Sequence, residues 1–117
     1  MSAPLRAAVV GVGYLGAFHA DKYASLDDVD LVAVVDVDST RAQTIATRCR
    51  TEAATDYRTL FGRVDCVSLA VPTPLHFALT QEFLAHGIDV LVEKPLTASV
   101  ADGRALVDAA ERDGRIL

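Results

Sequence analysis

Short apolar runs alternate with helical patterns along the chain, and this alternation restricts the fold more than any other feature of the sequence. The apolar runs, each rich in Val, Ala or Leu, lie at 6–10, 31–36, 53–55, 64–71 and 88–93. Helical patterns lie at 14–26, 40–50, 74–87 and 99–114, with a short helical turn at 57–61. Apolar strands separated by helices indicate a parallel sheet covered on both faces. We therefore predict an α/β fold with a doubly wound parallel sheet.

The length of 117 residues suits one domain and leaves little room for a second. Residues 115–117 resemble the first residues of a sixth strand, so we expect the domain 1–117 to be incomplete at its C-terminal edge. The helix at 40–50 is expected to bury Ala42, Ile45, Ala46 and Cys49. The helix at 99–114 is expected to bury Gly103, Leu106, Val107 and Ala110. Because a mid-helix glycine costs about 1 kcal/mol relative to alanine, Gly103 is expected to let a neighbour approach closely.

Charge and composition exclude several classes of protein. The net charge of -5, without a local cluster of Lys or Arg, argues against a nucleic-acid partner. No apolar run reaches the roughly 20 residues that a membrane helix needs. The apolar stretch after Arg6 is similar to a signal peptide. However, three glycines interrupt this stretch at the spacing of the glycine-rich motif described below. Two cysteines are too few for a disulfide framework, which favours a reducing, cytoplasmic location.

The motif Gly11-Val12-Gly13-Tyr14-Leu15-Gly16 follows the first predicted strand and opens the first predicted helix. In this context the first Gly permits a tight turn and the second lets a pyrophosphate approach the backbone. The third lets the helix pack closely on the strand. Free N–H groups at the helix N-terminus would then face the phosphates. The motif predicts a dinucleotide-binding site.

Asp36 ends the second predicted strand, 20 positions after Gly16, where a carboxylate binds the adenosine ribose hydroxyls. A carboxylate there repels a 2′-phosphate, so we expect NAD, with Val37 beside the same site. Arg41 could accommodate a 2′-phosphate, which leaves NADP open. The alternative is that Asp36 only caps the next helix.

The fourth and fifth strand ends complete the predicted site. The loop after the fourth strand would form a stiff wall beside the nicotinamide ring, with Val71, Pro72, Thr73 and His76 in contact with it. The alternative is that the prolines only end the strand and begin the next helix, and that His76 is a surface residue. Glu93, Lys94 and Pro95 leave the fifth strand at the same edge of the sheet. A lysine there would be partly removed from water and could transfer a proton. The alternative is a solvated Glu–Lys pair. The histidines share no metal-ligand spacing, so no metal site is predicted.

With these strand ends in place, the chain resembles the N-terminal part of the Gfo/Idh/MocA family of oxidoreductases over residues 5–117. The matching stretches are "AVVGVGYLGAFHA", "VVDVD" and "AVPTPLHFALTQEFLAHGIDVLVEKPLTAS". The resemblance implies an NAD(P)-dependent dehydrogenase that moves a hydride between nicotinamide and a secondary alcohol of a sugar, cyclitol or polyol. It also implies that Lys94 is the active-site lysine, that Glu93 lies near the nicotinamide ribose, and that the peptide bond before Pro95 is cis.

Members of this family normally continue for about two hundred residues more, in a domain that supplies further substrate-binding residues and often the dimer interface. The chain itself is therefore expected to bind cofactor without turnover, and to associate with other copies. Two other classes remain open. One is a non-catalytic NAD-binding sensor or co-regulator module, against which Lys94 argues. The other is an S-adenosylmethionine methyltransferase, which usually has an acidic residue before the glycine-rich turn, where this chain has Val9 and Val10.

Overall fold

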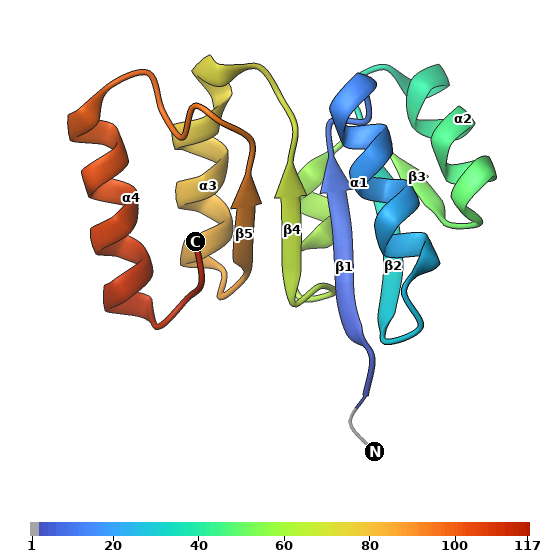
Figure 1. Ribbon diagram of the computed structural model, residues 1–117, viewed down its shortest axis with the longest axis horizontal. Helices are drawn as coiled ribbons and strands as arrows, with labels where there is room; N and C mark the ends of the chain where they lie inside the picture. The colour runs from blue at the N-terminus through green and yellow to red at the C-terminus, as the bar shows by residue number, and fades with distance from the viewer. Residues whose placement is uncertain (1–2) are drawn as a thin grey trace.

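The computed structural model describes residues 3–117, so the first two residues of the predicted domain lie outside the described part. The described strands are β1 (Leu5–Val10), β2 (Val29–Val35), β3 (Glu52–Ala54), β4 (Cys66–Leu69) and β5 (Asp89–Val92). They form one parallel sheet in the order β3-β2-β1-β4-β5 (Figure 1). The predicted α/β fold with a doubly wound parallel sheet is confirmed.

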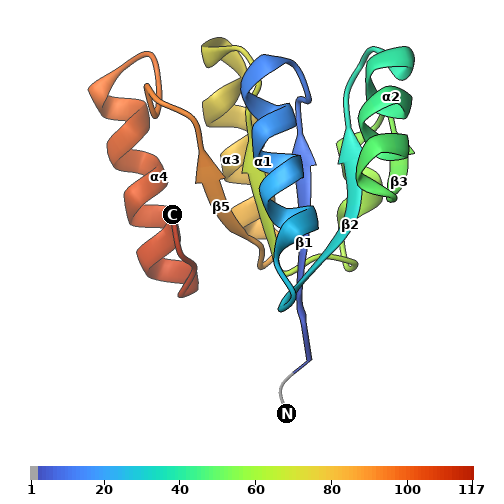
Figure 2. The ribbon, with the colours of Figure 1, turned by 45° about the vertical axis from the view of Figure 1, so that its right-hand side comes forward.

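Helices cover both faces of this sheet. They are α1 (Tyr14–Ser25), α2 (Ser39–Cys49), α3 (His76–Ala85) and α4 (Val100–Asp113), with single 3₁₀ turns η1 (Tyr57–Leu60) and η2 (Thr73–Leu75). Helices α1 and α2 pack against one cluster of buried residues that includes Val9 and Val34. Helices α3 and α4 pack against a second cluster, which includes Val67 and Val90 from the opposite face (Figure 2). No helix within residues 3–117 is long and apolar enough to cross a membrane.

Local signals set the ends of the helices. The Asp38 carboxylate accepts the Arg41 N–H at 3.1 Å and begins α2, and the Ser99 hydroxyl accepts the Asp102 N–H at 3.1 Å and begins α4. Gly114, with φ of 66°, ends α4 in the left-handed region. The helix predicted from residue 74 instead starts as η2, and α3 begins only at His76.

Two predictions about packing and strand extent are wrong. Val107 is 43% exposed, whereas Ala109 is buried with Leu106 and Ala110, because positions i, i+3 and i+4 share a helix face. Residues 115–117 form no strand, although the Val90 N–H donates to the Ile116 carbonyl at 2.9 Å. The predicted close approach at Gly103 is confirmed, because a Cβ there would lie 3.2 Å from Thr97 Oγ1.

The order of the strands places a crevice between β1 and β4. The chain moves outward from β1 through β2 to β3 and then returns to β4 on the other side of β1. Loops leaving the carboxyl ends of β1 and β4 therefore run in opposite directions, which is where ligands bind in such sheets. Helix α1 is held over this region by the Tyr23 hydroxyl, which lies 2.6 Å from Ser68 Oγ in the middle of β4.

Candidate functional site

A cavity of about 470 Å³ opens at the carboxyl ends of β1, β2 and β4. Its lining includes seven of the predicted cofactor residues, namely Gly11, Gly13, Asp36, Val37, Arg41, Val71 and Pro72. The remaining lining residues are Val10, Val35, Thr55, Tyr57, Ala70, Leu75, Ala78 and Leu79. The rule that ligands bind beyond the strand ends therefore locates the cavity correctly from the sequence.

The first and third glycines of the motif pack against each other with no room for a side chain. Gly11 has φ of 87°, and a Cβ there would lie 2.5 Å from the Ala70 carbonyl oxygen. Gly16 is buried, and a Cβ there would lie 1.7 Å from the Gly11 carbonyl oxygen. The turn thus joins the end of β1, the start of α1 and the end of β4 by direct backbone contact.

The second glycine has the opposite environment. A Cβ on Gly13 would meet no atom within 4 Å, and the φ of Gly13 is -70°, which any residue can adopt. Packing inside the protein therefore does not require glycine at this position. Because Gly13 lines the cavity at the N-terminus of α1, the open space beside it is suited to a phosphate group that approaches the backbone.

Asp36 is 7% exposed and connects the end of β2 to the glycine-rich turn. Its Oδ2 accepts the Val12 N–H at 3.0 Å, and its Oδ1 accepts the Asp38 N–H at 2.9 Å. The guanidinium of Arg41 lies 3.6 Å from Oδ2 at the cavity wall. Asp38, and not Asp36, caps α2, so the helix-capping alternative for Asp36 is wrong.

Sequence reasoning missed one wall of the cavity, formed by Thr55, Tyr57, Leu75, Ala78 and Leu79. Thr55 directly follows β3, so the strand-end rule could have found it. The Tyr57 hydroxyl donates to the Glu82 carboxylate, and its ring packs on Phe83 with centroids 5.6 Å apart. Burial and the nearby Glu82 carboxylate raise the pKa of Tyr57, because both disfavour the charged phenolate.

The other residues of the glycine-rich motif lie away from the cavity lining. The Val12 side chain is 2% exposed and packs in the core beneath α1. Val12 therefore contributes to the turn through its backbone N–H and not through its side chain. Tyr14 and Leu15 are 81% and 51% exposed, and the Tyr14 ring packs edge-on against Phe18. Both side chains stand on the first turn of α1. Thr73 begins η2 just beyond the lining residue Pro72.

His76 is neither a surface residue nor part of the cavity lining. It is 1% exposed, and both ring nitrogens face backbone carbonyls. Nε2 lies 2.9 Å from the Val71 oxygen, and Nδ1 lies 2.8 Å from the Pro95 oxygen and 3.3 Å from the Leu96 oxygen. The ring therefore connects the loop after β4 with the loop after β5.

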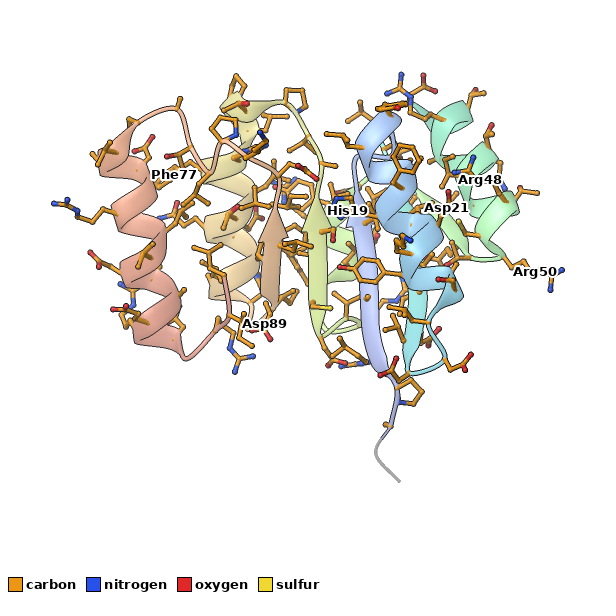
Figure 3. All side chains as sticks on the ribbon, in the orientation of Figure 1. His19, Asp21, Arg48, Arg50, Phe77 and Asp89 are labelled. Atoms are coloured by element: carbon orange, nitrogen blue, oxygen red, sulfur yellow. The ribbon has the colours of Figure 1, made fainter. Side chains whose placement is uncertain are left out.

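The segment Glu93-Lys94-Pro95 leaves β5 at the same sheet edge, outside the lining of the cavity. The Glu93 N–H donates to the Leu69 carbonyl at 3.0 Å, and its carboxylate lies 2.7 Å from Nε2 of His19 on α1 (Figure 3). Lys94 is exposed. The Lys94–Pro95 peptide bond is cis, as the resemblance implies.

The arrangement suits a ligand that carries both phosphates and ribose hydroxyls. The open space beside Gly13, at the N-terminus of α1, forms a cradle that a phosphate group can enter. The Asp36 carboxylate lies at the end of the same cavity, where it can accept hydrogen bonds from hydroxyl groups. Within residues 3–117 no group of three or more His, Cys, Asp or Glu side chains is placed to hold a metal ion. The open space beside Gly13 and the Asp36 carboxylate together favour a dinucleotide at this site.

The chain is similar to known proteins over nearly its whole length. The chain is 36% identical over 113 residues to UDP-N-acetylglucosamine 3-dehydrogenase of Acidithiobacillus ferrooxidans, covering 97% of this chain and 36% of that protein. It is 38% identical over 112 residues to inositol 2-dehydrogenase of Rubrobacter xylanophilus, covering 93% of this chain and 32% of that protein. The chain thus spans about a third of the length of these relatives.

Among solved structures, GenD2 from gentamicin A biosynthesis, in complex with NAD, superposes with a TM-score of 0.95. The two are 35% identical, and the match covers all of this chain and 34% of GenD2. The model of the oxidoreductase family with an NAD-binding Rossmann fold matches residues 5–117. The chain belongs to the Gfo/Idh/MocA family of oxidoreductases, and residues 5–117 form its NAD-binding Rossmann domain.

Proposed function

We propose that this chain binds NAD(H) in the cavity at the ends of β1, β2 and β4. The observation that carries the proposal is the contrast among the three glycines of the motif. Gly11 and Gly16 are required by contacts inside the protein, whereas Gly13 is not. A glycine with free space beside it, on a cavity wall at a helix N-terminus, is explained by a ligand that must approach the backbone closely.

Each end of the cavity has a separate role in this proposal. The N–H groups at the start of α1, beside Gly13 and with Tyr14 and Leu15 on the same turn, hold the pyrophosphate. Asp36 accepts hydrogens from the adenosine ribose hydroxyls, with Val37 and Arg41 at the rim. The nicotinamide lies toward the loops after β4 and β5, which contain Val71, Pro72 and Thr73 and the segment 93–95.

Cofactor choice is the first prediction, and it rests on Asp36. Wild-type protein is expected to bind NAD(H) at least tenfold more tightly than NADP(H), a difference of about 1.4 kcal/mol, because a buried carboxylate repels the 2′-phosphate. Asp36→Asn removes the charge at nearly the same side-chain shape, although its NH2 group can no longer accept the N–H of Val12 or Asp38. That loss affects both cofactors, so the ratio of the NAD(H) and NADP(H) affinities is the readout, and it should narrow. Isothermal titration with both cofactors measures all four affinities.

Arg41→Gln is the matched control for this prediction, because Arg41 is the cation that could offset the Asp36 carboxylate. It should widen the preference for NAD(H) by weakening NADP(H) binding. Equal affinities of the wild-type protein for the two cofactors would show that Arg41 compensates fully and that the role given to Asp36 is wrong.

The activity proposed for the protein is that of an NAD(P)-dependent dehydrogenase. Its substrate would be a secondary alcohol of a sugar, cyclitol or related polyol, which fits relatives that act on UDP-N-acetylglucosamine and on inositol. The nicotinamide supplies the hydride acceptor. Lys94 is exposed on the segment that leaves β5, and in this proposal it lies beside the nicotinamide and, as the neutral amine, accepts the proton of the hydroxyl group.

Association between copies is a second prediction. Strand β5 is an outer strand of the sheet, and Leu91 on its face is 56% exposed, close to Phe18 at 53%. Exposed edges and apolar faces of this kind pair with other chains. A polypeptide of residues 1–117 is therefore expected to form dimers or higher species at high concentration. Light scattering over a broad concentration range measures this, and a uniform monomer throughout would contradict it.

A further inference from the structure

The backbone on either side of Lys94 has few hydrogen bonds of its own. The Glu93 N–H makes the last ladder bond of the sheet, to the Leu69 carbonyl. From residue 94 to residue 98, the backbone makes no hydrogen bond to another backbone group within residues 3–117. The next regular element, α4, begins only at Val100. Side chains must therefore set the position of this segment.

Two histidines from different helices contact the segment on opposite sides of Lys94. His19, on the helix that begins at the glycine-rich turn, lies 2.7 Å from the carboxylate of Glu93. His76, the first residue of α3, lies 2.8 Å from the carbonyl oxygen of Pro95. These contacts involve the residues immediately before and after Lys94. Because consecutive Cα atoms are about 3.8 Å apart, or about 2.9 Å across a cis bond, holding both neighbours restricts the position of Lys94.

Both contacts are shielded from water, which strengthens them. The side chains of His19 and Glu93 are 20% and 25% exposed, and His76 is 1% exposed. His76 also faces the Val71 carbonyl, so all its partners are acceptors. A neutral imidazole donates to one side of this bridge, and a protonated imidazole donates to both. Neither histidine lines the cavity, so contact with the cofactor there does not explain them.

We propose that His19 and His76 are positioning residues that clamp residues 93–96 from both sides and thereby hold Lys94 against the nicotinamide end of the site. The His19 contact fixes the segment relative to α1, the helix that begins at the glycine-rich turn. The His76 contact fixes the segment relative to the loop after β4. This inference rests on the proposed NAD(H) site. It assigns a function to His76, which is buried, and to His19, which is partly buried. Contacts with substrate or cofactor do not account for either histidine.

The composition of the chain makes Lys94 easy to observe. The sequence contains two lysines, Lys22 and Lys94, so Lys22 is an internal reference for chemical labelling. Acetylation of each lysine by a soluble acylating reagent is measured by mass spectrometry, with and without saturating NAD⁺. The ratio of Lys94 to Lys22 labelling reports whether bound NAD⁺ shields Lys94. Saturation is set for each variant from its own titration, so a loss of affinity does not imitate a loss of shielding.

Wild-type protein should show Lys94 shielded by about tenfold when NAD⁺ is bound. His19→Leu cannot donate to the Glu93 carboxylate, and His76→Gln would turn its amide oxygen toward one of the two backbone carbonyls. Each variant should therefore lose most of this shielding. ADP, which lacks the nicotinamide half, should bind all variants within about twofold of wild type. His86→Gln is the matched control. This substitution removes an exposed histidine just after the end of α3, the helix that begins with His76. Bound NAD⁺ should still shield Lys94 fully in this variant.

Each outcome decides the proposal. Full shielding in either clamp variant that remains folded, or NAD⁺ binding without any shielding in wild type, would overturn it. If His76→Gln unfolds, as circular dichroism would show, the His19→Leu result decides alone, because His19 is partly exposed. Failure of folded wild-type protein to bind NAD⁺ in the titration would instead refute the proposed function, so the two failures are distinguishable.

Discussion

Gly13→Ala is expected to weaken NAD(H) binding by about a hundredfold and leave the fold intact, whereas Gly16→Ala is expected to destabilise the fold and, with it, the binding site. At Gly13 the backbone has an ordinary φ and a Cβ would contact nothing, so alanine should raise or lower the free energy of unfolding by no more than about 1 kcal/mol. The added methyl group would occupy the space beside the cradle. Affinity should fall by about a hundredfold, or 2.7 kcal/mol.

At Gly16 a Cβ would lie 1.7 Å from the Gly11 carbonyl oxygen, which is backbone and cannot rotate away. Helix α1 would have to separate from the turn, and overpacking costs about 1–3 kcal/mol, with a backbone contact this close at the upper end of that range. Thermal unfolding and NAD⁺ titration of both variants separate the two effects. A Gly13→Ala protein that binds NAD⁺ as tightly as wild type would show that the cradle does not hold the pyrophosphate.

A polypeptide of residues 1–117 is expected to bind NAD⁺ but to produce no measurable NADH from sugars, inositols or other polyols. Hydride transfer requires the alcohol carbon to be held over the nicotinamide while a group such as Lys94 accepts the proton. In the relatives, about two thirds of the chain lies outside the matched region. Without substrate positioning the barrier should rise by about 7–11 kcal/mol, which removes turnover.

The assay follows NADH absorbance with a panel that includes myo-inositol and UDP-N-acetylglucosamine. The full-length UDP-N-acetylglucosamine 3-dehydrogenase of Acidithiobacillus ferrooxidans serves as the positive control. NADH production that disappears in Lys94→Met would contradict the prediction, because it would mean that these residues already contain a complete catalytic site. In a longer polypeptide that turns over, the same substitution should lower kcat by about a hundredfold and leave NAD affinity nearly unchanged.

The sequence was sufficient to predict the fold and one side of the cavity, because both depend on local signals. The ends of β1, β2 and β4 follow from apolar runs and their stop residues, and they place Gly11, Asp36 and Val71 at one cavity. Thr55 was missed although it is the last residue of a predicted strand. Tyr57 could not be predicted, because its place in the wall depends on contacts with Phe83 and Glu82, which are distant in sequence.

Side-chain orientation in short or irregular segments was the other limit. The spacing of residues in the sequence allowed two interpretations of His76, a residue beside the nicotinamide ring or a surface residue. The structure shows a third arrangement, in which His76 is buried and bridges two loops. His19 carried no signal at all, because its partner Glu93 is 74 positions away. Val107 shows the same limit in a regular helix, where neighbouring positions differ by about 100° and an apolar residue type does not establish burial.

Amide chemical shifts of isotopically labelled residues 1–117, titrated with NAD⁺, test the central claim most directly. Binding at the proposed site should shift the amides of Gly11 and Gly13 at the turn, Val37 after β2 and Val71 after β4, with saturation at one NAD⁺ per chain. Residues 106–113 of α4, which lie outside the cavity lining, should not respond. A folded chain whose glycine-rich turn does not respond to NAD⁺ at millimolar concentration, or whose shifts lie elsewhere, would contradict the account.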